Sequence, residues 1–297
     1  MISLPITEDF TSSPFQVSDL SEKGYVRSIE ERSMTSLPVT EDFTSGPFQV
    51  SGLSDKGCVR TNNEDYFGYY IPTEEKLLRK WGSLFAVSDG VGGSAAGEVA
   101  SAEAVNVLLQ EYYFGDHSDK VPDRLKNVFR HAALHIYDLS ISHQTARNMK
   151  CTLSTLLLKH NRFFITHVGD SKIMLLRDKK IVQLTKDHNF VAQLVRMGLI
   201  TPEDARTHPN KNVLLKAVGD GPLLVPDFYS GFVNPGDLFC LITDGMLEHV
   251  TTEEFNSFIL ENGPTEKGLA KLITELNRRG GYDNMTIMTV KVNKVLE

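Results

Sequence analysis

The stretch at residues 83–101, SLFAVSDGVGGSAAGEVAS, decides how the rest of the chain is interpreted. Its apolar run at residues 84–87 predicts a short buried strand, which ends on the glycine-rich turn DGVGG before helical periodicity resumes. Glycines allow the backbone to come close to a ligand, and a buried carboxylate such as Asp89 needs a positive partner. The stretch therefore indicates either an ion-binding site or a simple turn, because Asp-Gly is also a common turn dipeptide.

Three other acidic turns share this arrangement: Glu64-Asp65, Asp244-Gly245 and Asp283-Asn284. Asp244 follows an apolar run and Asp283 precedes one, and because core strands end together at the edge of a sheet, we expect these acids to meet in space. Clustered carboxylates repel one another unless cations neutralise them, and oxygen ligands suit Mg²⁺ or Mn²⁺ better than zinc. Each acid alone is more simply a turn residue. Four such turns together favour a two-metal centre that activates water for attack on phosphorus.

The composition argues against several other classes of protein. The 297 residues carry a formal net charge of −7, which argues against a nucleic-acid surface. The three cysteines, Cys58, Cys151 and Cys240, form no C-x-x-C pair, so we expect reduced thiols and no cysteine-built metal site. No apolar run approaches the ~20 residues that span a membrane, and the N-terminus lacks a signal pattern. We therefore expect a cytoplasmic protein with no nucleic-acid or membrane partner.

A near-repeat occupies the N-terminal part of the chain. Residues 3–27 return with mild substitutions as residues 36–60, but only the second copy continues into Asn63-Glu64-Asp65. We therefore expect residues 1–34 to be an N-terminal extension that duplicates the start of a catalytic domain at residues 35–297.

Two consequences of the repeat can be weighed against each other. Residues 15–20 closely resemble residues 48–53, which we take as an edge strand, so the first copy could compete for that position and produce a strand-swapped dimer. The favoured alternative is a loosely attached extension on a monomer.

Hydrophobic periodicity predicts an alternation of helices and strands from residue 48 onward. The expected elements are strands at 48–53, 65–71 and 84–87, helices at 97–114 and 123–148, strands at 152–159, 162–168, 173–177 and 181–184, a helix at 187–197, an irregular insertion at 200–210, strands at 212–218, 224–233 and 237–243, helices at 252–261 and 266–278, and a strand at 285–292. Closely spaced strands suit antiparallel pairing, and with paired helices they predict an α+β layered domain.

Six motifs occur in a fixed order along residues 49–292. They are Ser54-Asp55-x-Gly57-x-x-Arg60-x-x-Asn63-Glu64-Asp65, Asp89-Gly90-Val91-Gly92-Gly93 with Gly97-Glu98, His167-Val168-Gly169-Asp170-Ser171, Leu184-Thr185-x-Asp187-His188, Gly236-Asp237 with Thr243-Asp244-Gly245, and Asp283-Asn284-x-Thr286. Each motif is weak alone, but the ordered set resembles the PP2C (PPM) metal-dependent serine/threonine phosphatases. The segment GLITPEDA at residues 198–205, followed by His208-Pro209, is similar to the flap of the bacterial members.

The resemblance implies an αββα sandwich, in which two antiparallel β-sheets are flanked by pairs of α-helices. It also implies two Mn²⁺ or Mg²⁺ ions, with a third in some members. By position, Asp89 would bridge both ions, Asp244 and Asp283 would hold the first, and Glu64 with the carbonyl of Gly90 would hold the second. Asp65 would lie behind these ligands, and Asp170 with Asp244 matches the third position. Arg60 matches the phosphate-binding arginine, so Arg60, Asp89 and Asp244 are the implied catalytic residues.

The chain departs from the family pattern at two places. Val91 stands where several eukaryotic members have a histidine proposed as general acid, so water would protonate the leaving group. Lys150 and Cys151 replace residues of a Gly-Thr-Thr motif that opens a core strand. Because this is not a ligand position, we expect the change to adjust backbone packing near the site without inactivating it. We interpret His167 and His188 as structural hydrogen-bonding residues, because neither has an acid or base partner visible in the sequence.

The sequence thus predicts a phosphatase that removes phosphate from phosphoserine and phosphothreonine and opposes a bacterial serine/threonine kinase. One alternative is a non-catalytic phosphoprotein-binding module on the same fold. The retention of Asp89, Asp244 and Asp283 argues against such a binder. Another alternative is a hydrolase of small phosphate esters, which the motifs do not distinguish from a protein phosphatase.

Overall fold

The computed structural model describes residues 24–27, 39–91, 95–115, 120–142 and 149–295. The strands, in chain order, are β1 (Gly24–Arg27), β2 (Val39–Ser45), β3 (Phe48–Asp55), β4 (Asp65–Pro72), β5 (Ser83–Val91), β6 (Lys150–Cys151), β7 (Leu153–Lys159), β8 (Arg162–Val168), β9 (Lys172–Arg177), β10 (Lys180–Gln183), β11 (Asp227–Phe232), β12 (Leu238–Ile242) and β13 (Met285–Val292). The helices are α2 (Glu75–Trp81), α3 (Ala95–Phe114), α4 (Val121–Ser142), α5 (Phe190–Arg196), α6 (Pro202–Thr207), α7 (Thr252–Asn262) and α8 (Glu266–Arg278), with the 3₁₀ turn η3 (Asp244–Leu247).

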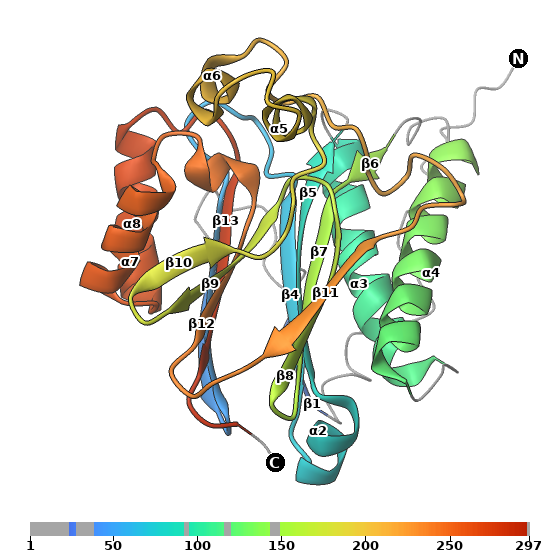
Figure 1. Ribbon diagram of the computed structural model, residues 1–297. Coiled ribbons are helices and arrows are strands. Elements are labelled where there is room, and N and C mark those ends of the chain that lie inside the picture. The colour runs from blue at the N-terminus through green and yellow to red at the C-terminus, as the bar shows by residue number, and fades with distance from the viewer. Residues whose placement is uncertain (1–23, 28–38, 92–94, 116–119, 143–148, 296–297) are drawn as a thin grey trace, which may run out of the picture.

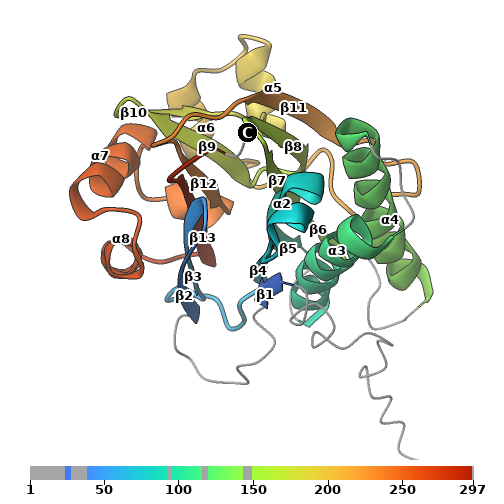
Figure 2. The same cartoon turned by 90° about the horizontal axis from the view of Figure 1, so that it is seen from below.

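Two antiparallel sheets lie face to face and a pair of helices covers each outer face (Figure 1). One sheet has the order β1-β4-β5-β7-β8-β11, with β6 paired to β5, and the other has the order β10-β9-β12-β13-β3-β2. Helices α3 and α4 cover the first sheet, and α7 and α8 cover the second; the view in Figure 2 shows the same four layers from below. The predicted αββα sandwich is therefore confirmed.

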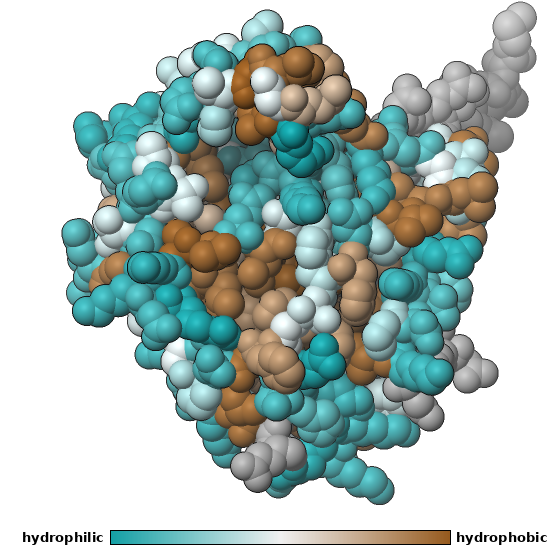
Figure 3. All heavy atoms as spheres, viewed as in Figure 1, coloured by the Kyte–Doolittle hydropathy of each residue, from teal (hydrophilic) through white to brown (hydrophobic). Residues whose placement is uncertain are grey.

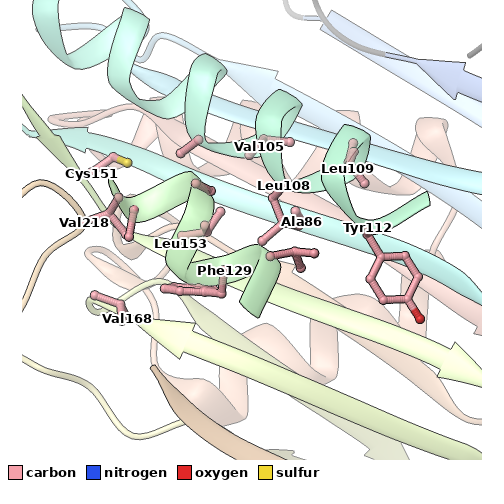
Figure 4. Packing of buried hydrophobic residues seen from close by; sticks show 14 of the residues in the cluster. Ala86, Val105, Leu108, Leu109, Tyr112, Phe129, Cys151, Leu153, Val168 and Val218 are labelled. Carbon is pink, nitrogen blue, oxygen red and sulfur yellow. The ribbon is translucent and has the colours of Figure 1, made fainter. Parts of the chain in front are cut away.

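Three buried clusters follow from this layering. The faces that the two sheets turn toward each other bury large side chains such as Phe67, Phe85 and Phe239. The cluster beneath α3 and α4 includes Leu108 and Phe129, which point toward the sheet in Figure 4. A third cluster lies beneath α7 and α8. Central strands such as β4 and β12 are buried along their whole length, and the burial of both faces explains why β12 is a continuous apolar run without alternation.

The N-terminal repeat behaves differently from the sequence-based expectation. The strand β3 is not at the edge of its sheet, because β2 pairs with it on one side and β13 on the other. The expectation that residues 48–53 form an edge strand is therefore wrong. Residues 15–20, the proposed competitor, lie outside the described residues. Part of the first copy, β1, instead pairs with β4 in the other sheet, with Gly24 opposite Pro72.

The segment between β10 and β11 also differs from the prediction. A helix, α6, occupies the insertion that we expected to be irregular, because Thr201 and Asp204 form a capping box and Pro202 occupies the first turn. The expected strand at 212–218 forms only two isolated bridges, Asn189 with Leu214 and Cys151 with Val218. The helix α2 was not predicted. Within the described residues, no helix is long and apolar enough to cross a membrane.

Candidate metal centre

A pocket of about 140 Å³ opens at the end of the sandwich that α5 and α6 overhang (Figure 1). It brings together residues from six separate parts of the chain, and hydrophilic residues gather below the overhanging helices in Figure 3. The lining residues are Arg60, Glu64, Asp89, Gly90, Val91, Asp170, Asn212, Leu214, Asp244, Asp283 and Asn284. All but one of the predicted site residues are therefore in one place; Asp65 lies behind the wall, buried and 5% exposed.

The pairing of β4 with β5 positions the first carboxylates. Asp65 and Asp89 are direct partners in the antiparallel register, so Glu64, the residue before β4, lies beside the end of β5. The backbone of Asp89 is fixed from the other side by Thr152, whose hydroxyl accepts a hydrogen bond from the Asp89 amide at 2.9 Å. The amide of Thr152 donates to the carbonyl of Asp89 at 2.8 Å. The strand end that carries Asp89 is therefore held on both edges.

Gly90 allows the chain to approach itself closely at this point. Its amide donates to the carbonyl of Glu64 at 3.0 Å. A Cβ added at Gly90 would overlap the carbonyl of Gly97 and would lie 2.7 Å from the carbonyl oxygen of Glu64. Glycine is therefore required by the close packing of three backbone segments. Gly92 and Gly93, the other glycines of the turn, lie outside the described residues.

The adjacent strands β12 and β13 position the second pair of acids. Asp244 begins the turn η3 directly after β12, and Asp283 precedes β13, so the antiparallel pairing of these strands brings the two acids to one end. Asn284 joins this edge to the first one. Its side-chain amide donates to the carbonyls of Lys56 and Asn62, each at 2.9 Å, and its oxygen accepts from the amide of Glu64 at 2.8 Å.

The electrostatics of the pocket favour bound cations. Burial raises the pKa of Asp244 to about 8, with repulsion from Asp170 and Asp283 as further causes. Burial also raises the pKa of Asp65 to about 7 and that of Asp89 well above its usual value, again with help from neighbouring carboxylates. A buried oxygen of Asp65, Oδ1, has no hydrogen-bond partner within the described residues. An all-oxygen donor set whose charges repel one another fits hard divalent cations.

Ion binding would require side chains of the pocket to move. Within the described parts of the chain, no three acidic, histidine or cysteine side chains already surround one point closely enough to hold an ion. One carboxylate is engaged elsewhere, because a guanidinium nitrogen of Arg60 donates to Oδ2 of Asp283 at 2.7 Å. This hydrogen bond also raises the pKa of Arg60. The Arg60 side chain remains about half exposed, so a ligand that enters the pocket can reach it.

The remaining predicted acid, Asp170, lies on the flap side of the pocket. It follows β8, and its carboxylate accepts a hydrogen bond from the side-chain amide of Asn189 at 3.1 Å. The ammonium of Lys172 donates to the backbone carbonyl of Asp170 at 2.8 Å and pairs with Asp187 at 2.9 Å. Asp170 therefore lies in the pocket wall, in contact with Asn189 just before α5.

The two histidines hold structure beneath the flap. The buried His167 shares hydrogen bonds with Ser154 at 2.8 Å and with the carbonyl of Lys186 at 3.1 Å, and burial lowers its pKa to about 3. His188 accepts from the amide of Gly169 and pairs with Asp227. Neither histidine lines the pocket, which agrees with the structural interpretation.

Lys150 and Cys151, which replace residues of the family motif, do not line the pocket. The Lys150 side chain forms an ion pair with Asp220 at 2.6 Å. Its neighbour Cys151 is fully buried, and its backbone pairs with Gly90 and with Val218. The lysine therefore replaces the family motif without placing a charge among the lining residues.

Three lining residues were not singled out from the sequence. Asn284 was part of a quoted motif, but its role in joining the two acidic edges depends on contacts with residues more than 200 positions away. Asn212 and Leu214 come from the segment that we expected to be a regular strand. No local pattern distinguishes them, because their position depends on how the segment after α6 folds back to pair with Asn189.

The fold and the pocket together define a phosphatase that depends on divalent metal, with carboxylates from both sheets at one edge and an arginine beside them. Comparisons with known proteins agree. The model of the family described as "Protein phosphatase 2C" matches residues 60–287. The chain therefore belongs to the protein phosphatase 2C family.

Individual relatives are bacterial phosphatases. The chain is 32% identical over 239 residues to the protein phosphatase PhpP of Streptococcus pneumoniae, covering 79% of this chain and 93% of the relative. The serine/threonine phosphatase of S. agalactiae superposes with a TM-score of 0.74 at 27% identity, covering 82% of this chain and 99% of that one. The catalytic domain of the serine/threonine phosphatase PstP in complex with two manganese ions superposes with a TM-score of 0.70 at 30% identity, covering 84% and 99%.

Proposed function

We propose that this protein hydrolyses phosphoserine and phosphothreonine in other proteins. The observation that carries the proposal is the convergence of Glu64, Asp89, Asp244 and Asp283 on one pocket, with Arg60 at its rim. The curated relatives and solved structures that are named serine/threonine phosphatases support it. A non-catalytic binding module is less favoured, because such a module has no need to keep this set of acids.

The residues present fit two Mn²⁺ or Mg²⁺ ions, with a third position beside them. Asp89 would be shared by two ions, Asp244 and Asp283 would hold one, and Glu64 with the carbonyl of Gly90 would hold the other. Asp170 and Asp244 would hold a third, and Asp65 would support the ligands from behind. When bound, such ions supply an activated water nucleophile and neutralise charge on the phosphate.

Arg60 is the residue proposed to bind the substrate phosphate. Its planar guanidinium can donate two parallel hydrogen bonds to phosphate oxygens. In the described structure it donates to Asp283, so phosphate binding exchanges one anionic partner for another and leaves that carboxylate available to a cation. Val91, which lines the pocket, has no proton to give, so the leaving hydroxyl takes its proton from water.

The proposed partners are phosphorylated proteins and the serine/threonine kinase that phosphorylates them, and the proposed location is the cytoplasm. The catalytic unit is proposed to be residues 35–297 acting as a monomer, with residues 1–34 as an extension. The family match covers residues 60–287, which lie within the proposed catalytic unit.

The test is phosphate release from a phosphothreonine peptide and from a small phosphate ester, with Mn²⁺, Mg²⁺ or EDTA. We expect metal-dependent turnover of the peptide and a loss of roughly 1,000-fold or more in Asp244→Asn, because this acid would hold ions at the reacting centre. Asp220→Asn, which removes a half-exposed acid paired with Lys150 outside the pocket, is the matched control. A folded protein that binds Mn²⁺ without turnover would favour the binding module, and turnover of the small ester alone would favour a general esterase.

A further inference from the structure

The two copies of the N-terminal repeat, residues 3–27 and 36–60, are similar enough to compete for the same place in the fold. The apolar residues that β3 buries, Phe48, Val50 and Leu53, return unchanged in the first copy. The copies differ at five pairs of positions: Ile6/Val39, Ser13/Gly46, Asp19/Gly52, Glu22/Asp55 and Tyr25/Cys58. What selects the second copy as β3 therefore lies in these differences or in the residues that follow the repeat.

Gly52 faces the space between the two sheets. In β3, which pairs with β13 on one side and with β2 on the other, Gly52 lies opposite Met288. Side chains alternate along a strand, so Gly52 shares its face with Phe48 and Val50. These two residues belong, with Met288, to the cluster between the sheets. Any side chain at position 52 would therefore point into that cluster.

The structure leaves no room for a side chain at this position. A Cβ added at Gly52 would lie 2.6 Å and 2.7 Å from two ring carbons of Phe67 on β4. Phe67 is itself buried in the same cluster, and because protein interiors are close-packed, its ring can shift only if its neighbours move too. The first copy carries Asp19 at this position. A carboxylate buried among apolar side chains is strongly unfavourable unless a cation pairs with it.

A second difference between the copies acts in the same direction. Gly46 lies in the turn between β2 and β3 with a φ of +55°, a backbone conformation that glycine adopts far more readily than most other residues. The first copy has Ser13 there. Asp55, in contrast, is only half-buried, so Glu22 of the first copy would not have to enter the core. The main obstacle to the first copy is therefore Asp19.

The choice of copy matters for the pocket. The second copy continues into Asn63, whose side-chain amide donates to the hydroxyl of Ser54 on β3 at 2.8 Å. The first copy has Glu30 at the corresponding place, and an ionised carboxylate cannot donate this hydrogen bond. With the first copy in position, residues 28–63 would also separate the arginine of the repeat from Glu64. An exchange of the copies would therefore disrupt the edge of the pocket that carries Glu64.

We propose that Asp19 excludes the first copy from the place of β3, and that Gly52 reserves this place for the second copy. The exclusion acts within one chain and equally between two copies of the chain, because the obstacle, the buried ring of Phe67, is the same in both cases. The competing explanation is that the contacts of the residues after the repeat select the second copy by themselves. In that case residue 19 makes no difference.

Three variants of the full chain separate these explanations. Asp19→Gly removes the carboxylate from the first copy and alters none of the described residues. Gly52→Asp places the carboxylate in both copies. The combined variant Asp19→Gly/Gly52→Asp exchanges the two residues and leaves composition and net charge unchanged. Glu22→Asp is the matched control, because it also makes the first copy more similar to the second, but at a position that is only half-buried in β3.

The experiment measures amide hydrogen exchange by mass spectrometry and thermal unfolding of the metal-free protein. Peptides 15–22 and 48–55 differ in mass in the wild type and in every variant, because residues 19, 22, 52 and 55 never match fully. In Asp19→Gly we expect exchange at residues 48–55 to become about tenfold faster or more and exchange at residues 15–22 to become slower, because the two copies now compete. Glu22→Asp should exchange as the wild type does.

The thermal measurement tests the reciprocal exchange. Gly52→Asp should lower Tm by about 10 °C or more, and adding Asp19→Gly should recover about half of that loss or more. In the combined variant the slow exchange should move from residues 48–55 to residues 15–22. Light scattering then shows whether the first copy enters its own chain, at unchanged mass, or a second chain, at doubled mass; either result supports the proposal.

Three outcomes would overturn the proposal. Unchanged exchange at residues 48–55 in Asp19→Gly would show that residue 19 does not exclude the first copy. An unchanged Tm in Gly52→Asp would show that position 52 tolerates a side chain, and a combined variant as unstable as Gly52→Asp would show that the first copy does not fit even without its carboxylate. If Gly52→Asp does not fold, Asp19→Gly still decides the question. These measurements use no substrate, so they are independent of the proposed function.

Discussion

The two copies of the N-terminal repeat end in nearly the same four residues but have different structures. Gly24–Arg27 of the first copy forms β1 and pairs with β4. The corresponding residues of the second copy, Gly57 to Arg60, form a loop in which Gly57 has a φ of +78° and Cys58 donates its amide to Gly281 at 2.7 Å.

The difference lies in what each copy can contact. The second copy continues into Asn62 and Glu64, and Asn284 forms hydrogen bonds with both residues. These bonds hold the loop beside the end of β13 where the acidic residues lie. Only there does the final arginine meet Asp283. The conformation of these four residues is therefore decided by the segments that they contact and not by their intrinsic conformational propensity.

The largest expected difference between the two copies is in the effect on activity of replacing the final arginine of each. Arg60→Ala should lower kcat/KM by roughly 100-fold or more, because hydrogen bonds to a charged group contribute about 1.5–3 kcal/mol each. Arg27→Ala should leave kcat/KM unchanged, since β1 pairs with β4 and is not among the segments that line the pocket. Steady-state kinetics on a phosphothreonine peptide measure both. Equal losses in the two variants would show that the copies are functionally equivalent and would contradict the comparison.

An intermediate effect is expected from the two glycines. Gly57→Ala should lower the free energy of unfolding by about 1–3 kcal/mol, the usual cost of a strained backbone conformation. An added Cβ there would overlap the carbonyl of Asp283 and lie 2.7 Å from that of Gly281. Gly24→Ala, within a strand, should change stability by less than about 0.5 kcal/mol. Urea unfolding of metal-free protein provides the measurement. An unchanged free energy of unfolding in Gly57→Ala would contradict the close packing of this loop against Gly281 and Asp283.

The smallest effect is expected from removing the first copy. A chain that starts at Met34 loses β1, a strand of four residues at the edge of its sheet. We expect unchanged phosphatase rate and unchanged mass per particle by light scattering, with a shift in Tm of no more than about 2–4 °C. A change from dimer to monomer on truncation would revive the strand-swapped arrangement. An increase in mass would instead indicate that β1 protects the edge of β4 from pairing with other chains.

The sequence alone determined the layered α+β class and the identity of the acidic residues. The long helices and buried strands could be predicted because hydrophobic periodicity is a local property. Asp89, Asp244 and Asp283 could be proposed as a group because each adjoins an apolar run that forms a central strand. The ordered motifs then indicated the family, which the comparisons confirm.

The tertiary structure decided what depends on contacts between distant segments. The capping box of α6 was present in the sequence, but the segment lacks an apolar face, so periodicity did not reveal the helix. The strand β3 could not be recognised as internal, because its neighbour β2 is polar and resembles a loop. Asn212 and Leu214 reach the pocket only because the segment after α6 folds back toward the carboxylates, and Asn284 joins both edges only after the sheets have packed. Local pattern therefore identifies which residues can do chemistry, whereas packing decides which of them meet.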